Sequence, residues 1–387
     1  MSRLDELINE LCPDGVEYRK LAQIADIGTG SSNTNDGLEN GKYPFFVRSQ
    51  EPLRMNDYEY DETAIITAGD GVGVGKVFHY VEGKYALHQR AYRIHINTDD
   101  VMPKFFYYYM RATFLAYIQK TMFFGSVASI RRPMLNKYPV PVPPLPVQSE
   151  IVRILDKFTE LSSLLSAELT ARRKQYEYYR ENFYCTLKAD KVPLSSLGTL
   201  TRGKRFVHAD AVETGVPCIH YGELYTYYGV YANKAKSHIR EELRDKMRYA
   251  SKGDVIIVGA GENKVDIGVG LAWEGDYDVA VHDACYTLKH NQNPKYISYF
   301  LRTNLYHDQI MKYVSEAKIC AISAKNIGRA LIPLPPLPVQ ARIVSILDRF
   351  DSLCNDITAG LPAEIASREK QYSFYRDRLL SFKRRAK

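Results

Sequence analysis

Apolar side chains recur at helical spacing over two long segments of the chain. In the first segment the apolar positions follow one another in steps of three and four, with one longer gap, at Ile151, Ile154, Leu155, Phe158, Leu161, Leu165, Leu169, Tyr176, Tyr179 and Phe183. Such steps place side chains on one face of an α-helix. About 40 residues of helix would span about 60 Å. We therefore predict a single long helix here.

The pattern returns near the end of the chain, at Ile343, Ile346, Leu347, Phe350, Leu353, Ile365, Tyr372, Tyr375 and Leu379. Gly360-Leu361-Pro362 interrupts it and predicts that the helix stops and restarts. Matching apolar stripes favour an antiparallel coiled coil, although each helix could instead lie on its own domain. The predicted helix and partner interface comprises Ile151, Leu155, Phe158, Tyr176, Tyr179, Ile343, Leu347, Phe350, Tyr372 and Tyr375.

The rest of the chain has shorter periodic segments. Ala64–Thr67 and Val255–Val258 are β-branched runs followed by glycines, and they predict strands that end in turns. Phe105–Gln119 and Tyr296–Tyr313 predict helices. Each half of the chain is therefore expected to hold a globular α+β domain.

The chain contains an internal repeat. Pro143–Phe158 and Pro335–Phe350 agree at twelve of sixteen positions with an offset of 192 residues. The repeat continues from Lys174–Arg180 to Lys370–Arg376, at an offset of 196. Chance does not produce such agreement, so the two halves are expected to share one architecture with a pseudo-twofold relation.

Proline-rich runs, Pro139–Pro146 and Pro333–Pro338, precede both predicted helices. Because each sits at the same junction, we interpret them as stiff spacers rather than as ligands for another domain. The expected organisation is a recognition domain, a spacer helix, a second recognition domain and a second spacer helix, over residues 1–146, 147–187, 188–338 and 339–387.

Composition narrows the possible functions. The 387 residues carry a net charge of +7, which mildly favours an acidic partner, and include 30 tyrosines but one tryptophan. No apolar stretch has the length of a membrane span, and the N-terminal sequence does not resemble a signal peptide, so a cytoplasmic location is expected. The six cysteines lack zinc-ligand spacing, and we predict that all are small buried side chains.

Several near-motifs do not support catalysis. Gly71–Val77 departs from the phosphate-loop pattern at Asp70 and Val77, and we interpret it and Gly259–Glu262 as tight turns. Glu82-Gly83-Lys84 could be part of a nuclease site, but we favour a hairpin turn there, between strands at 77–81 and 85–87. We find no other motif of hydrolases, metalloenzymes or adenine methyltransferases. No cofactor is expected in this chain.

Basic and amide side chains in loops instead suggest contact with double-stranded DNA. Arginine and glutamine can recognise base edges, whereas lysine and serine typically contact phosphates. The candidate DNA-binding residues are Arg48, Lys76, Gln89, Arg90, Ser126, Arg131, Arg132, Arg202, Lys204, Arg205, Tyr221, Lys264 and Lys325.

The repeated segments resemble the two conserved regions of type I restriction-modification specificity subunits. The resemblance rests on P-P-L-P-V-Q-x-x-I-V-x-I-L-D-[KR]-F, each copy leading to K-Q-Y-x-[YF]-Y-R. Asp14–Tyr18 and Gly215-Val216-Pro217 with Gly222 fit the entry segments of the two units. The resemblance covers the whole chain in organisation and is most specific over residues 139–183 and 332–382.

The resemblance implies that each α+β domain reads one part of a split DNA site and that the chain is not an enzyme. The helices would act as a ruler and dock two modification subunits, which carry S-adenosylmethionine and methylate adenine; motor-nuclease subunits would join them. Thr159–Leu169 occupies the place of a short repeated element in such proteins. Other interpretations remain open: a recognition subunit without a restriction partner, a protein-binding scaffold, or a stand-alone nuclease.

Overall fold

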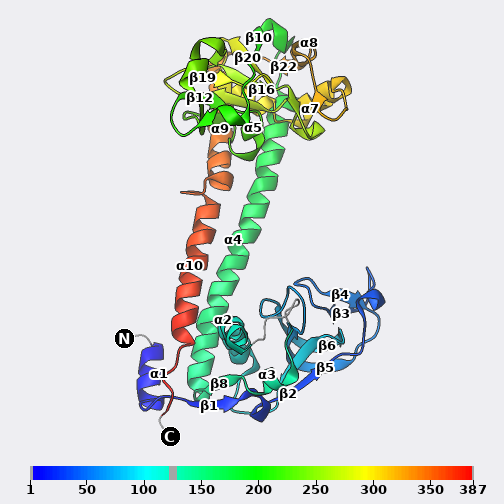
Figure 1. The fold of residues 1–387 in the computed structure, drawn as a ribbon, viewed down its shortest axis with the longest axis vertical. Helices are drawn as coiled ribbons and strands as arrows, with labels where there is room; N and C mark the ends of the chain where they lie inside the picture. Colours follow the sequence, from blue (N-terminus) through cyan, green and yellow to red (C-terminus); the bar gives the residue numbers. More distant parts are fainter. Residues whose placement is uncertain (1–2, 122–128, 386–387) are drawn as a thin grey trace. The chain divides into compact units, whose positions relative to one another are not determined.

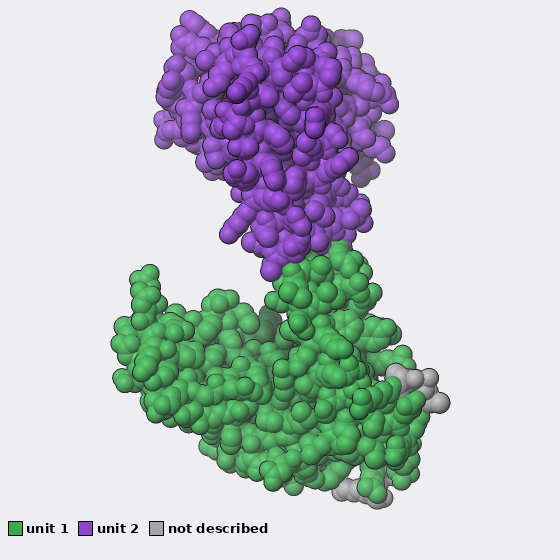
Figure 2. Space-filling model, turned by 180° about the vertical axis from the view of Figure 1, so that it is seen from behind, with its two compact units in different colours: residues 1–166, 364–387 green, residues 167–363 purple. Residues whose placement is uncertain are grey.

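The computed structural model describes residues 3–121 and 129–385. The chain divides into two compact units, which Figure 2 shows in different colours. Unit 1 comprises residues 1–166 and 364–387, and unit 2 comprises residues 167–363. Helices α4 (Leu145–Thr186) and α10 (Leu361–Leu379) contribute residues to both units.

A six-stranded sheet with the order β2-β7-β5-β6-β3-β4 forms the centre of unit 1. Its neighbouring strands are antiparallel, except that β3 and β6 are parallel. Helix α2 packs on this sheet (Figure 1), and its phenylalanines share a buried core with Ile65 and Ile94. The elements are α1 (Arg3–Leu11), β1 (Glu17–Lys20), β2 (Ala25–Thr29), β3 (Tyr43–Phe46), β4 (Leu53–Met55), β5 (Tyr60–Ala68), β6 (Phe78–Leu87), β7 (Ala91–Ile96), α2 (Pro103–Thr121), α3 (Arg132–Asn136) and β8 (Pro139–Val142), which pairs with β1.

Unit 2 contains two five-stranded sheets, β10-β20-β16-β18-β13 and β11-β14-β12-β19-β15, and the pairs β17-β21 and β9-β22. The tryptophan of the chain, Trp273, is fully buried in its core. The elements are β9 (Lys191–Pro193), β10 (Gly198–Arg202), β11 (Ala211–Val212), β12 (Val216–Ile219), α5 (Glu223–Thr226), β13 (Tyr231–Ala232), β14 (Ser237–Ile239), β15 (Tyr249–Ala250), β16 (Val255–Val258), β17 (Ala260–Gly261), β18 (Gly270–Trp273), β19 (Val279–Val281), β20 (Cys285–His290), α6 (Pro294–Phe300), α7 (Asn304–Ile310), β21 (Cys320–Ala321), α8 (Ala324–Gly328), β22 (Leu331–Pro333) and α9 (Leu337–Asn355). Both halves are α+β, as predicted.

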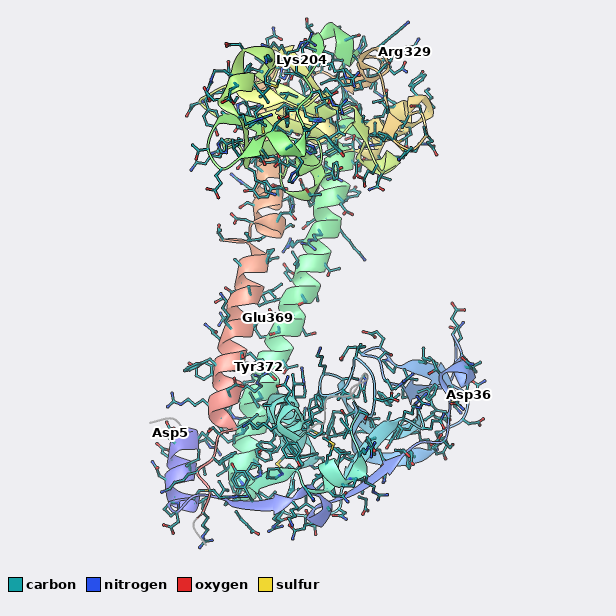
Figure 3. All side chains as sticks on the ribbon, in the orientation of Figure 1. Asp5, Asp36, Lys204, Arg329, Glu369 and Tyr372 are labelled. Atoms are coloured by element: carbon teal, nitrogen blue, oxygen red, sulfur yellow. The ribbon has the colours of Figure 1, made fainter. Side chains whose placement is uncertain are left out.

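Aromatic rings join α4 to its neighbouring helix within each unit. In unit 1, the ring of Phe158 lies 6.2 Å from that of Tyr372 and 5.6 Å from that of Tyr375 on α10; Figure 3 labels Tyr372. In unit 2, the ring of Phe350 on α9 lies 6.4 Å from that of Tyr176 and 5.4 Å from that of Tyr179. The predicted pair of long antiparallel helices is confirmed (Figure 1), with the second helix divided into α9 and α10.

The remaining four positions of the predicted helix interface lie in the cores of the two units. Ile151 and Leu155 are fully buried in the core that holds α2, and Ile343 and Leu347 are buried in the core around Trp273. Each long helix therefore begins on the globular part of its own unit. The two long helices therefore pair with each other and also pack on their own domains, so both arrangements predicted from the sequence occur together.

The predicted interruption of the second helix lies at residues 356–360. Asp356 Oδ1 accepts hydrogen bonds from the amide of Thr358 at 2.7 Å and from its hydroxyl at 2.6 Å. A Cβ atom on Gly360 would lie 2.5 Å from the carbonyl oxygen of Ser352, so only glycine fits at this position. Pro362 lies in the first turn of α10. Backbone amides in the first turn have no acceptor within the helix, so the missing N–H group of proline costs no hydrogen bond there.

Three local predictions were wrong. Glu82-Gly83-Lys84 is no hairpin turn, because β6 runs through it in register with β5 and Gly83 adopts a φ of 92° within the strand. The helix predicted over Tyr296–Tyr313 is divided into α6 and α7, since the side chain of Thr303 caps a new helix by accepting from the amide of Tyr306. Gly259–Glu262 is no tight turn, because Ala260–Gly261 forms β17.

The prediction that all six cysteines are buried was also wrong in one case. Five are buried and Cys185, near the end of α4, is exposed; all six are free thiols.

Each unit joins its globular part to its helix through a repeated glutamine. Gln148 Oε1 accepts from the amide of Met102 at 2.8 Å, and its Nε2 donates to the carbonyl of Pro143 at 2.7 Å. Gln340 makes the corresponding bonds to Asn293 at 3.1 Å and to Pro335 at 2.8 Å. Both glutamines are fully buried, and every such bond avoids an unpaired buried group.

A lysine, a tyrosine and an aspartate form a second repeated contact at each junction. In unit 1, Asp156 accepts from Lys104 at 2.8 Å and from the hydroxyl of Tyr108 at 2.6 Å. In unit 2, Asp348 accepts from Lys295 at 3.1 Å and from the hydroxyl of Tyr299 at 2.7 Å. The two halves of the internal repeat therefore share these side-chain contacts as well as their sequence pattern.

Candidate nucleic-acid interface

Backbone hydrogen bonds hold three loops of unit 1 together beyond the end of β5. The amide of Gly69 donates to the carbonyl of Arg90 at 2.9 Å, and the amide of Ile130 donates to the carbonyl of Gly69 at 2.8 Å. The Nδ1 atom of the buried His88 accepts from the amide of Arg90 at 2.9 Å and shapes the turn between β6 and β7. The loops after β5, after β6 and before α3 therefore form one surface.

Unit 2 repeats this framework with different residues. The amide of Gly259 donates to the carbonyl of Ala284 at 2.7 Å, and the amide of Ile322 donates to the carbonyl of Gly259 at 2.9 Å. His282 Nδ1 accepts from the amide of Ala284 at 3.1 Å. Each bond has its counterpart in unit 1, which gives a position-by-position correspondence between the two loop surfaces.

Two predicted arginines of unit 1 share one carboxylate. Arg48 donates to Asp70 Oδ1 at 2.7 Å, and Arg90 donates to Asp70 Oδ2 at 3.2 Å. Partial burial tends to raise the pKa of Asp70, but the hydrogen bonds from Arg48 and Arg90 outweigh it and lower the pKa. The carboxylate therefore stays charged and restrains two guanidinium groups whose charges it only half neutralises.

Gln89 lies next to this cluster. Its amide donates to the carbonyl of Ser32 at 2.9 Å, and its side chain donates to Asn33 Oδ1. Gln89 and Asn33 are both exposed. Together they offer amide groups of the kind that recognise adenine edges.

The other candidates in unit 1 lie in the same loops. Lys76 is exposed in the turn between β5 and β6, where its amide donates to the carbonyl of Gly73 at 3.0 Å. Arg131 and Arg132 are exposed at the start of α3, next to the bridge between Asp70 and Ser129. Ser126 lies outside the described residues.

Aromatic rings line the corresponding surface of unit 2. The ring of His282 lies 4.7 Å from that of His220, 5.5 Å from that of Tyr221 and 4.8 Å from that of Phe206. Burial lowers the pKa of both histidines, and the proximity of His220 lowers that of His282 further. The two imidazoles are thus neutral at pH 7, and Tyr221 extends a neutral ring cluster.

Basic residues follow the end of β10 in unit 2. Arg202 Nε donates to the carbonyl of Asp283 at 2.6 Å, and Arg248 donates to the carbonyl of Arg202 at 2.7 Å. The amide of Lys204 donates to the carbonyl of Val281 at 2.9 Å; Lys204 is labelled in Figure 3. Lys204 and Arg205 have exposed side chains beside the histidine turn. The predicted cluster at residues 202–205 therefore lies on the loop surface. Lys204 and Arg205 are exposed there, whereas Arg202 hydrogen-bonds to the neighbouring loop.

Lys264 and Lys325 flank this surface. Lys264 forms an ion pair with Glu316, so its charge is largely compensated. Lys325 is exposed in α8, which Ser323 caps by accepting from the amide of Asn326.

Sequence reasoning did not identify Asp70, Asn33, His220, His282 and Arg248 as part of these surfaces. Asp70 is separated by 22 residues from Arg48 and by 20 from Arg90. No local spacing signals such a contact. The one repeated feature among them is a histidine directly after a strand, His88 after β6 and His282 after β19.

Within the described residues, no group of three or more histidine, cysteine, aspartate or glutamate side chains could hold a metal ion. None of the described helices combines the length and apolar character needed to cross a membrane.

A family model, described as the type I restriction modification DNA specificity domain, matches the chain twice, over residues 13–171 and 188–367. The chain belongs to this family. The two matches correspond to the two halves of the internal repeat, and the chain is thus a DNA sequence-specificity subunit of the type I class, in which the subunit itself has no catalytic function.

Similar proteins agree with this assignment. A Haemophilus influenzae protein named as a type I restriction enzyme specificity subunit is 29% identical, over 95% of this chain and 96% of that protein. The Escherichia coli EcoR124I/EcoR124II specificity subunit is 32% identical over 64% of this chain and 63% of its own length. The crystal structure of the type I S subunit from M. genitalium has a TM-score of 0.56 at 15% identity, and the match covers 94% of this chain and 96% of that one.

Proposed function

We propose that the loop surface of each unit reads one part of a bipartite, asymmetric DNA site. The observation that carries this proposal is that one backbone framework holds different side chains in the two units. Arginines and a glutamine occupy it in unit 1, whereas a neutral aromatic cluster and the basic residues 202–205 occupy it in unit 2. Unlike side chains on like frameworks favour unlike half-sites and hence a non-palindromic target.

The proposed DNA contacts are those of the loops, with phosphate and base contacts divided by side-chain chemistry. They comprise Arg48, Lys76, Gln89, Arg90, Ser126, Arg131, Arg132, Arg202, Lys204, Arg205, Tyr221, Lys264 and Lys325. Residues 1–146 and 188–338 are the proposed recognition domains. The proposal places the chain in the cytoplasm, together with the DNA that it reads.

The helices, at residues 147–187 and 339–387, have a second proposed role. They would dock two modification subunits, which supply S-adenosylmethionine and methylate adenine, and restriction subunits would join that complex. Exposed aromatic side chains on the helices, such as Tyr178 and Phe374, support a protein-binding role because large exposed rings are enriched at interfaces.

The proposed function is tested by co-expressing the chain with its modification subunit in a host free of DNA methylation. Methylated adenines are then mapped by long-read sequencing. The expected result is a split, asymmetric motif that requires both proteins. A modification subunit that binds S-adenosylmethionine yet gives no motif with this chain would refute the proposal.

Lengthening α4 is expected to lengthen the spacer between the two half-sites. Four residues inserted within Thr159–Leu169 add about one helical turn, about 6 Å, which corresponds to about two base pairs. The methylation map should show a longer preferred spacer and unchanged half-sites. The control carries the same four residues between Glu39 and Asn40, two exposed loop positions of unit 1. An unchanged spacer in the helix variant would contradict the ruler role.

A further inference from the structure

The correspondence between the two loop surfaces identifies positions where the units differ. Gly69 and Gly259 occupy equivalent places, because each receives and donates the same backbone bonds. It follows that Asp70 corresponds to Ala260 and that Arg90 corresponds to Ala284. Both members of the arginine-restraining contact in unit 1 are thus replaced by methyl side chains in unit 2.

The third member of the cluster can be placed in the same way. In unit 1, Phe46 of β3 pairs in parallel with Leu87, and the amide of His88 donates to the carbonyl of Phe46 at 3.0 Å. In unit 2, Ile219 of β12 pairs in parallel with Val281, and the amide of His282 donates to the carbonyl of Ile219 at 3.2 Å. Two residues after these strand ends stand Arg48 and Tyr221. The arginine pair of unit 1 therefore has no counterpart in unit 2.

The arginine pair is built to present donors in a fixed direction. The side chains of Arg48 and Arg90 are 39% and 62% exposed, whereas that of Asp70 is 21% exposed. A guanidinium group has five N–H donors, and in the described part of the chain each of these two gives one of them to Asp70. The remaining donors are available to a partner outside the protein, and the carboxylate below reduces the rotamer freedom that binding would otherwise cost.

We propose that Arg48 and Arg90, oriented by Asp70, read guanine in the half-site of unit 1, and that the corresponding residues of unit 2, Tyr221 and Ala284, make no such contact. The inference rests on the proposed function and deepens it. Guanine presents O6 and N7 as two adjacent acceptors in the major groove, which match the paired donors of a guanidinium group. A phosphate contact would not require two oriented guanidinium groups. The carboxylate of Asp70 would also repel a phosphate.

The test uses the full chain, co-expressed with its modification subunit, and the methylation map as readout. Arg48→Lys and Arg90→Lys keep the charge and remove the paired donors. At one or two positions of the half-site read by unit 1, the preference for guanine is expected to fall by about tenfold to a hundredfold. The half-site of unit 2 should keep its sequence and serves as an internal control. Arg19→Lys is the matched control variant, because Arg19 also pairs with carboxylates in unit 1 but lies on β1.

Asp70 is a positioning residue, and its variants provide an independent test. Asp70→Asn removes the charge that holds both arginines and should relax the same guanine positions, whereas Asp70→Glu should largely restore them. A purely structural role would lower methylation at all sites without changing the motif.

Two results would overturn the inference. One is an unchanged motif in both lysine variants; the other is a uniform loss of methylation over all sequences, which is the signature of a phosphate contact. Failure of the proposed function looks different, because the parent chain itself would then direct no split motif.

Discussion

Unit 2 is expected to lose about 3 kcal/mol of its free energy of unfolding as the pH falls from about 6.5 to about 4, through His290 alone. Burial lowers the pKa of His290 to about 4. Its Nδ1 atom accepts a hydrogen bond from the amide of Gln292 at 3.0 Å. Its Nε2 atom is buried and has no hydrogen-bond partner among the described residues. The folded protein therefore holds this imidazole neutral.

The direction of the effect follows from proton linkage. Above pH 6.5 the imidazole is neutral in both the folded and the unfolded chain, so stability is fully present. As the pH falls, the unfolded chain takes up the proton, and the folded chain does so only near pH 4. A difference of about 2.5 pKa units corresponds to about 3 kcal/mol. His220, His282 and His307 have lowered pKa values for the same reason of burial and add to the loss.

Fluorescence of Trp273 is the measurement, because the chain has one tryptophan and it is buried in unit 2. Urea unfolding is followed at several pH values. His290→Gln should flatten the dependence on pH by about 3 kcal/mol, whereas His238→Gln, at a half-exposed position of the same unit, should leave it unchanged. Equal slopes for the parent and the His290 variant would show that this histidine is protonated in the folded chain.

Asp348→Ala is expected to cost unit 2 about 3 kcal/mol, whereas Asp156→Ala should cost unit 1 about 1 kcal/mol. The two aspartates make the same contacts at the two junctions but differ in exposure. Lys295 and Asp348 are 15% and 31% exposed, and Lys104 and Asp156 are 40% and 36% exposed. Removing one partner of a largely buried pair leaves an uncompensated charge, whereas solvent screens the more exposed pair.

Lys295 keeps two contacts in the Asp348 variant, because its Nζ lies 3.6 Å from the centre of the Tyr231 ring and 3.6 Å from Glu274. The expected cost therefore stays at the low end of the range for a broken buried pair. Urea unfolding followed by Trp273 fluorescence reports the effect on unit 2, and circular dichroism reports the effect on the whole chain. Asp156→Ala should leave the fluorescence transition in place. Equal losses from the two substitutions would mean that the junctions do not differ as their exposures indicate.

The long helices and the two-unit organisation could be predicted because their signals are local or repeated. Helical spacing places Ile151 and Leu155 on one face without knowledge of what they contact, and the repeat of 143–158 at 335–350 shows the duplication directly. Gly360 and Pro362 act on the backbone next to them, so the break between α9 and α10 was also visible.

Features that depend on distant partners could not be predicted. Glu82-Gly83-Lys84 has the composition of a turn, but β5 supplies eight paired positions and keeps β6 extended. Asp70 was noted only as a departure from a phosphate-loop pattern, because its two arginines come from other loops. Basic loops could be recognised as candidates from the sequence, whereas the pairing that orients them could not.

The repeated joints have a consequence for how new sequence preferences arise. Gln148 with Asp156, and Gln340 with Asp348, fasten each globular part to its helix through the same hydrogen bonds. These hydrogen bonds do not involve the loops that differ between the units. A globular part can therefore be exchanged for another without any change in the helix that it packs on. Genetic exchange between the two joints would replace one half-site of the recognised DNA sequence and leave the spacing between the half-sites unchanged.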